Sequence, residues 1–254
     1  MASRKFRIYR GDNQSGDLVD YNCEVTEGMV VLDIIHRIQA DQANDLACRW
    51  NCKAGKCGSC SMEINGKPRL ACMTRMNEYE EGQTITITPL KTFPVMRDLV
   101  PDVSWNYEQN KRIKQFKPDP KAKTDKGLVM YQQDVDRVQE FRKCIECFLC
   151  QNVCHVLRDH EQQSKFVGPR LMIRLASLDM HPADVEDRIP EIKNEYGSGI
   201  CNITRCCTDV CPEHIEITDN GIIPLKERVV DRYYDPLGRL FQAVRMRRKK
   251  KSAK

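Results

Sequence analysis

The sequence predicts an α+β fold, with a small mixed sheet carrying one helix in the first part and helices in the second. Apolar residues alternate in several short segments before residue 105, and beyond residue 127 they recur at helical spacing. Both parts contain clustered cysteines. We therefore expect a sheet-containing domain over 1–106, a basic linker over 107–127, a helical domain over 128–242 and a basic tail over 243–254.

The first domain is expected to begin with two strands and a helix. Residues 4–10 and parts of 18–25 alternate apolar and polar side chains, and the GDNQSGD segment between them is typical of a turn. Helical spacing follows Thr26, with apolar residues at Val30, Val31, Ile34, Ile35 and Ile38. Further strands are expected at SMEI and RLACM, which flank the Asn65-Gly66 turn, and at TITIT over 84–88.

The apolar pattern lapses over residues 107–127, where basic residues dominate and Pro118 and Pro120 interrupt any helix. Beyond this segment three stretches have apolar residues at helical spacing. These residues are Val135, Val138, Phe141 and Ile145, then Leu171, Ile173, Leu175 and Leu178, then Ile222, Leu225, Val229 and Val230.

The composition excludes several classes of protein. Secreted disulfide scaffolds reach this cysteine content, but they are usually short, and the MASRKFRIYRG start has no apolar signal region. No segment approaches the roughly 18 to 20 apolar residues of a transmembrane helix. The net charge of +5 comes from the tail, without which acidic residues slightly outnumber basic ones. Because aromatic residues are only 7% of the chain and do not alternate with this basic cluster, no nucleic-acid site is expected.

The first cysteine group has the C-x4-C-x2-C spacing of a plant-type [2Fe–2S] ferredoxin, completed by one distant cysteine. Its members are Cys52, Cys57, Cys60 and Cys72. Gly55 and Gly58 would let the loop wrap closely and aim its N–H groups at the sulfur atoms. A zinc site is the alternative, but zinc sites usually pair two C-x2-C segments and this loop has only one.

The segments CIECFLCQNVC and CNITRCCTDVCP form a two-cluster ferredoxin pattern, in which the fourth cysteine of a run binds the other cluster. A [4Fe–4S] cluster is expected on Cys144, Cys147, Cys150 and Cys211. The remaining group consists of Cys154, Cys201 and Cys207. Thr204 stands where a further cysteine would complete the motif, and a hydroxyl is a poor ligand for iron. This group is therefore expected to hold a [3Fe–4S] cluster.

Three cysteines lie outside these groups. Cys23 is on the apolar side of a predicted strand and is expected to be a buried core thiol. Cys48 is not needed for the first spacing. Cys206 adjoins Cys207, and if it reached the Thr204 corner the third cluster would be [4Fe–4S].

No side chain is predicted to be catalytic. The five histidines have no metal-binding or catalytic spacing, and no GxGxxG, GxxxxGK or GxSxG motif occurs. The chain is therefore expected to carry electrons rather than to transform a substrate.

Four segments, in this order, resemble the iron–sulfur subunit of succinate dehydrogenase and fumarate reductase over nearly the whole chain. They are NCKAGKCGSC with ACMT, CIECFLCQNVC, FVGPR and CNITRCCTDVCP. The resemblance implies a plant-type ferredoxin-like β-grasp domain followed by an all-helical ferredoxin domain. It also implies a subunit of succinate dehydrogenase that relays single electrons from a flavoprotein, which holds FAD and the dicarboxylate site, to quinone at a membrane-anchor subunit. The chain would lie peripherally on the cytoplasmic side of the cell membrane.

The sequence departs from mitochondrial-type members at several positions. Those members have Pro directly after the fourth cysteine of the first run and a Trp pair shortly after it, with His and Ile beside the three-iron cluster. Here these positions are His155, Arg158, Asp159, Asn202 and Thr204. They predict a different type of anchor, with haem as a further cofactor, rather than a quinone pocket of the mitochondrial type.

Two alternative functions are considered. A zinc-stapled interaction module with a nucleic-acid-binding tail would be colourless. An iron–sulfur subunit of a thiol-linked fumarate reductase or heterodisulfide reductase would usually carry a further cysteine-rich domain. Ligand spacing does not determine the direction of electron flow, because cluster potentials also depend on hydrogen bonds and exposure.

Overall fold

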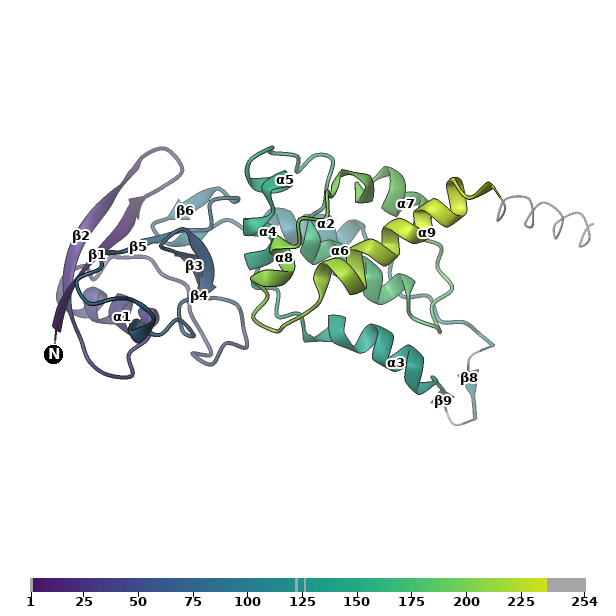
Figure 1. Cartoon of the computed structure of the whole chain (residues 1–254), viewed down its shortest axis with the longest axis horizontal. Helices are drawn as coiled ribbons and strands as arrows, with labels where there is room; N and C mark the ends of the chain where they lie inside the picture. The colour runs from purple at the N-terminus through teal and green to yellow at the C-terminus, as the bar shows by residue number, and fades with distance from the viewer. Residues whose placement is uncertain (1, 122, 126, 237–254) are drawn as a thin grey trace, which may run out of the picture.

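The computed structural model describes residues 2–121, 123–125 and 127–236, which form a sheet-containing part and a helical part placed end to end (Figure 1). The basic tail expected over 243–254 lies outside the described residues. In the described part of the chain, no helix has the length and apolar character needed to cross a membrane.

The sheet-containing part is built on a five-stranded mixed sheet, as the sequence predicted. Its strands are β1 (Ala2–Gly11), β2 (Gly16–Val25), β3 (Ser61–Ile64), β4 (Lys67–Leu70) and β5 (Ile85–Thr88). They lie in the order β2-β1-β5-β3-β4. Strands β1 and β5 are parallel, and the other neighbours are antiparallel.

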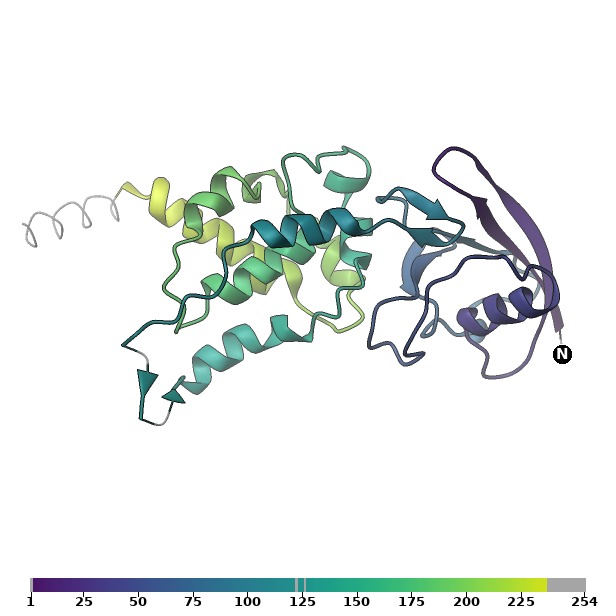
Figure 2. The ribbon, with the colours of Figure 1, turned by 180° about the vertical axis from the view of Figure 1, so that it is seen from behind.

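Helix α1 (Val31–Asp41) lies against this sheet (Figure 2). Its first turn is closed by the Asp33 carboxylate, which accepts the backbone N–H of Val30 at 3.0 Å. The predicted apolar residues Ile34, Ile35 and Ile38 are fully buried against the sheet. Burying each such side chain contributes about 1.5–3 kcal/mol, so this face fixes the helix in place.

The expected strand RLACM ends early. Strand β4 stops at Leu70, and the following residues turn, with the Ala71 N–H donating to the Cys60 carbonyl at 3.0 Å. The Thr74 hydroxyl donates back to the Leu70 carbonyl at 2.9 Å. This turn carries Cys72 away from the sheet edge toward the loop that contains Cys60, which alternation alone does not reveal.

A short hairpin of β6 (Val95–Arg97) and β7 (Val100–Pro101) leads into helix α2 (Ser104–Arg112). Residues 107–112 were expected in the linker, because they have no apolar periodicity. Helix α2 is held partly by a polar contact, since buried Asn106 accepts the side-chain N–H of buried Gln151 at 2.8 Å. Trp105 packs against the apolar cores and Tyr107 against the Phe148 ring. Two aromatic residues two positions apart do not give the apolar periodicity of a helix.

The helical part contains short helices and one two-stranded hairpin. The hairpin consists of β8 (Lys123–Thr124) and β9 (Gly127–Leu128). The helices are α3 (Gln132–Gln139), η2 (Glu140–Lys143), α4 (Leu149–Val153), α5 (His155–Arg158), α6 (Pro169–Asp179), α7 (Ile189–Asn194), η3 (Ser198–Ile200), α8 (Cys206–Asp209), η4 (Ile217–Ile222) and α9 (Ile223–Tyr233). The three predicted helical stretches correspond to α3 with η2, to α6 and to α9.

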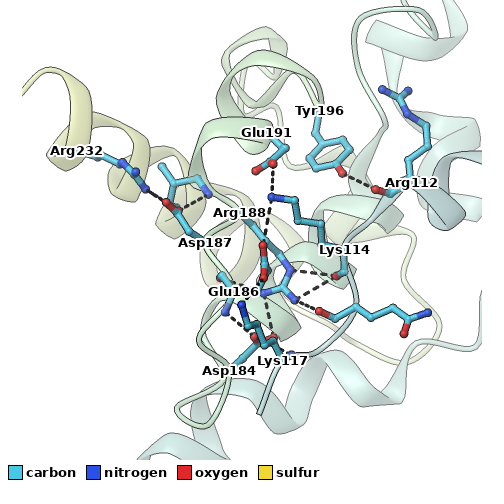
Figure 3. Close-up of polar contacts among 12 residues, drawn as sticks. Arg112, Lys114, Lys117, Asp184, Glu186, Asp187, Arg188, Glu191, Tyr196 and Arg232 are labelled. Atoms are coloured by element: carbon cyan, nitrogen blue, oxygen red, sulfur yellow. Dashed lines mark hydrogen bonds and ion pairs between the residues drawn. The ribbon is translucent and has the colours of Figure 1, made fainter. Parts of the chain in front are cut away.

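The connecting segment after α2 is fixed to the helical part by a buried polar network (Figure 3). Arg188 is 1% exposed and donates to the carbonyl oxygens of Lys114 and Gln115. It also forms an ion pair with Asp184 at 2.9 Å. The Tyr196 hydroxyl donates to the Arg112 carbonyl at 3.0 Å. The connection therefore has a defined course over the described residues.

We expect Arg188→Gln to lower the free energy of unfolding by about 3–5 kcal/mol, because the buried Asp184 carboxylate then lacks its counter-charge. The control is Arg232→Gln, which breaks the exposed ion pair with Asp187 and should cost about 1 kcal/mol or less. Denaturant unfolding of both variants measures the difference. Equal losses in the free energy of unfolding would show that the buried ion pair stabilises the protein no more than the exposed one.

Candidate metal centres

Three cysteines of the first group, Cys52, Cys57 and Cys60, lie on the loop between α1 and β3. Backbone N–H groups of this loop point toward a cysteine sulfur. Lys53 and Gly55 have positive φ angles of 54° and 67°, which turn the chain back on itself. The N–H groups of Ala54 and Lys56 each donate to the Cys52 sulfur at 3.3 Å. The loop therefore presents N–H donors to its thiols, as the glycine spacing predicted.

The distant cysteine joins this loop through the turn after β4. The Cys72 N–H donates to the Cys60 sulfur at 3.4 Å, and the Ser61 hydroxyl donates to the Gly58 carbonyl at 2.8 Å. Burial raises the pKa of Cys60 to about 12. Burial also acts to raise the pKa of Cys57, but hydrogen bonds from Ser59 and the Cys52 N–H lower it to about 6.

The second group lines a pocket in the helical part. Its lining includes Cys144, Cys147, Cys150 and Cys211. Glu146 and Phe148 have positive φ angles of 55° and 60°, and these two left-handed residues turn the chain between the first three cysteines. Burial raises the pKa of Cys147 to about 12 and that of Cys150 well above its usual range.

The third group surrounds a neighbouring cavity. Cys154, Cys201 and Cys207 line it together with Thr204 and Cys206. Burial raises the pKa of Cys154 to about 11 and that of Cys207 to about 12. The Thr204 hydroxyl is 3.3 Å from the Cys206 sulfur, and the Cys206 thiol also donates to the Val153 carbonyl at 3.5 Å. Both candidates for the fourth corner therefore lie at the same cavity.

The three groups follow one another in space. A Cβ atom added to Gly58 would be 2.7 Å from Cys147 Cα, so the loop of the first group touches that of the second. Next to this contact, Lys56 Nζ is 2.9 Å from Glu213 Oε1. Helix α4, which carries Cys150, packs against α8, which carries Cys207, and the Cys206 thiol of α8 donates to the Val153 carbonyl of α4. The order is first group, second group, third group.

The donor chemistry of these sites fits iron–sulfur clusters. Buried thiols with raised pKa values release their protons when a positively charged centre binds, and soft thiolates favour iron and zinc over hard cations. The cysteines of the second and third groups line pockets. In the described part of the chain, no three His, Cys, Asp or Glu side chains converge closely enough to hold a single metal ion.

The cysteines outside the groups are placed differently. Cys23 is 4% exposed within the core of the sheet-containing part, which confirms its interpretation as a core thiol. Burial raises the pKa of Cys48 to about 12, and its thiol donates weakly to the Arg49 carbonyl. All fourteen cysteines lie among the described residues and are free thiols.

Two hydroxyl groups beside the cysteines were not found by sequence reasoning. Thr218 is 1% exposed and its hydroxyl is 3.4 Å from the Cys207 sulfur. It lies eleven residues away in the chain, so no local spacing links the two. The second is the hydroxyl of Ser61, which donates to the Gly58 carbonyl. Ser61 is the first residue of a strand in which all four residues are buried. A serine among apolar neighbours is the one signal that could have indicated it.

Comparisons with known proteins agree with this geometry. Residues 5–108 match a 2Fe-2S iron-sulfur cluster binding domain, and residues 140–215 match a 4Fe-4S dicluster domain. A succinate dehydrogenase iron-sulfur subunit of Bacillus subtilis is 31% identical over 185 residues, which cover 71% of each chain. Fumarate reductase iron-sulfur subunits, such as that of Escherichia coli, match at 30% identity with 75% of their length covered. The chain belongs to the iron–sulfur subunit family of succinate dehydrogenases and fumarate reductases.

The same family relationship appears in a solved structure, the Mycobacterium smegmatis Sdh1 complex in the apo form. One of its chains is 63% identical and superposes with a TM-score of 0.89, covering 92% of this chain and 98% of the other. An uncharacterized iron-sulfur protein of Methanococcus maripaludis is 33% identical over 84% of this chain, which spans only 42% of that longer protein. This family member thus contains a [2Fe–2S] domain followed by a 4Fe–4S dicluster domain.

Gly58→Ala should disturb the contact between the first and second groups. Its φ of 69° already disfavours alanine by about 1–2 kcal/mol, and the added Cβ must push Cys147 away. Gly66→Ala is the matched control, because its φ is 75° but a Cβ there meets nothing within 4 Å. We expect Gly58→Ala to be about 1–3 kcal/mol less stable than the control. Denaturant unfolding of the two variants is the measurement, and equal stability would contradict the contact.

Proposed function

We propose that this chain is the electron-carrying iron–sulfur subunit of a succinate dehydrogenase or fumarate reductase complex. It relays single electrons between a FAD-bearing flavoprotein subunit and quinone at a membrane anchor. The observation that carries the proposal is the series of three cysteine groups, in which Gly58 touches Cys147 and helix α4, with Cys150, packs against helix α8, with Cys207.

The proposed ligand sets follow this series. A [2Fe–2S] cluster would be held by Cys52, Cys57, Cys60 and Cys72, and a [4Fe–4S] cluster by Cys144, Cys147, Cys150 and Cys211. A [3Fe–4S] cluster would be held by Cys154, Cys201 and Cys207. When bound, such clusters take up and release one electron at a time. The chain supplies thiolates, N–H donors that stabilise negative charge on sulfur, and buried surroundings that exclude water.

The finer features of fold and assembly belong to the same proposal. The mixed sheet with α1 is a β-grasp domain, and the part that follows is an all-helical ferredoxin domain. The chain lies peripherally on the cytoplasmic side of the cell membrane through its anchor. The 63% identical chain of the Sdh1 complex supports an assembly of this kind. His155 and Asn202, two of the positions at which the sequence departs from mitochondrial-type members, favour an anchor of the haem-containing type.

Metal analysis of anaerobically purified protein tests the proposal. About nine irons and ten acid-labile sulfides per chain would establish [2Fe–2S], [4Fe–4S] and [3Fe–4S] clusters. About ten irons would mean that Cys206 or another ligand fills the Thr204 corner. Zinc with little sulfide would refute electron transfer and support the zinc-stapled module.

Replacement of one ligand in the third group gives a functional prediction. We expect Cys207→Ser to abolish quinone reduction by the complex while succinate still reduces the flavin, because the last of the three groups then loses a thiolate. Cys48→Ser, outside all three groups, should leave both reactions unchanged. Stopped-flow absorbance of flavin and quinone measures both steps. Unchanged quinone turnover in Cys207→Ser would contradict the relay.

A further inference from the structure

We propose that Glu63 is a positioning residue whose buried carboxylate, paired with the half-buried Arg158, holds the first cysteine group at a fixed distance from the second. The inference rests on the proposed function, because it assigns to Glu63 an effect on electron transfer between the groups. Glu63 is not one of the proposed ligands, and in the described part of the chain its side-chain hydrogen bonds and ion pairs involve none of them. It acts through the segments that carry them.

Glu63 occupies an unusual position for a carboxylate. It lies on β3, where all four residues are buried, and its exposed fraction is 0%. Neighbouring residues of a strand point to opposite faces, so Met62 and Ile64 share the face that belongs to the core, while Glu63 points the other way. On that side Glu63 meets Asn152 of α4 and Arg158 of α5, and a carboxylate is almost never buried without such partners.

Two partners of Glu63, Asn152 and Arg158, belong to the helical part, whereas Glu63 lies in the sheet-containing part. Its Oε1 accepts the Asn152 amide N–H at 2.8 Å and is 3.0 Å from Arg158 Nη1. Lys91, on the same side as Glu63, approaches Oε2 to 3.5 Å. Thr92 completes the contact, because its N–H and hydroxyl donate to the Asn152 side-chain and backbone oxygens at 3.1 and 3.2 Å. We call these five residues the Glu63 clamp.

The Glu63 clamp joins the segments that carry the cysteines. Glu63 is three residues after Cys60, and the strand it lies on begins with Ser61, whose hydroxyl holds Gly58. Asn152 lies midway between Cys150 and Cys154, and Arg158 is the last residue of α5. Movement at the clamp would therefore shift Gly58 relative to Cys147, which is the contact between the first two groups.

The physics of buried ion pairs favours a role in geometry. Removing two charges from water costs about as much as their attraction returns, so such a pair adds little net stability. Charge-assisted hydrogen bonds are short and directional, however, and they hold two elements in one relative position. Arg158 is one of the positions at which the sequence departs from mitochondrial-type members. Glu63 is its partner in the clamp.

The test uses the intact complex with Glu63→Gln, Arg158→Gln and the double variant. Asp20→Asn is the matched control, because it breaks an exposed ion pair with Lys5 on the far strands. Electron paramagnetic resonance of the reduced complex measures the magnetic interaction between the first two clusters, which falls with the cube of their separation. Iron and sulfide are measured for every sample.

We expect each single variant to keep its iron and sulfide but to show a weaker magnetic interaction spread over a range of values. The double variant should recover part of the interaction, because no unpaired buried charge remains, and the control should match the wild type. A single variant with lower thermal stability but an unaltered interaction would overturn the proposal. If the complex with Glu63→Gln does not assemble, the magnetic interaction in Arg158→Gln alone tests the proposal. Wild-type complex without iron and sulfide would instead refute the proposed function.

Discussion

The close approach of Gly58 to the backbone of Cys147 is the constraint on which the rest of this structure depends. Only a residue without a Cβ can hold a positive φ and lie this near to another main chain. The two parts of the molecule have separate hydrophobic cores, yet this contact makes their cysteine loops neighbours. The ion pair between Lys56 and Glu213 and the Glu63 clamp also join the two parts of the molecule.

The three cysteine groups share a ligand type but differ in their surroundings. In the first, Cys52 is exposed while Cys60 and Cys72 are buried, and hydrogen bonds lower the pKa of Cys57. In the second and third, burial raises the pKa values of Cys150 and Cys207. Exposure and hydrogen bonding are the means by which a protein adjusts cluster potentials. The fold thus places the same type of ligand, the cysteine thiolate, in three different environments.

Buried polar contacts position several elements that apolar packing alone would not. Helix α2 is held by Asn106 and Gln151, the connecting segment by Arg188, and the junction of the two parts by Glu63. Each contact requires correct geometry, because an unpaired buried charge or amide is costly. Such contacts specify one arrangement, whereas apolar surfaces tolerate sliding.

The sequence by itself determined the mixed sheet, helix α1, the helical second part and the grouping of cysteines, because these depend on spacings of a few residues. It did not locate α2, which has no apolar periodicity and is held by the Asn106–Gln151 pair and two aromatic residues, or the turn that moves Cys72 beside Cys60. Only the tertiary structure decided that Gly58 meets Cys147, that Thr204 and Cys206 line one cavity, and that Glu63 is buried. The physical reason is distance along the chain: Glu63 and Asn152 are 89 residues apart, and no local pattern records such a pair.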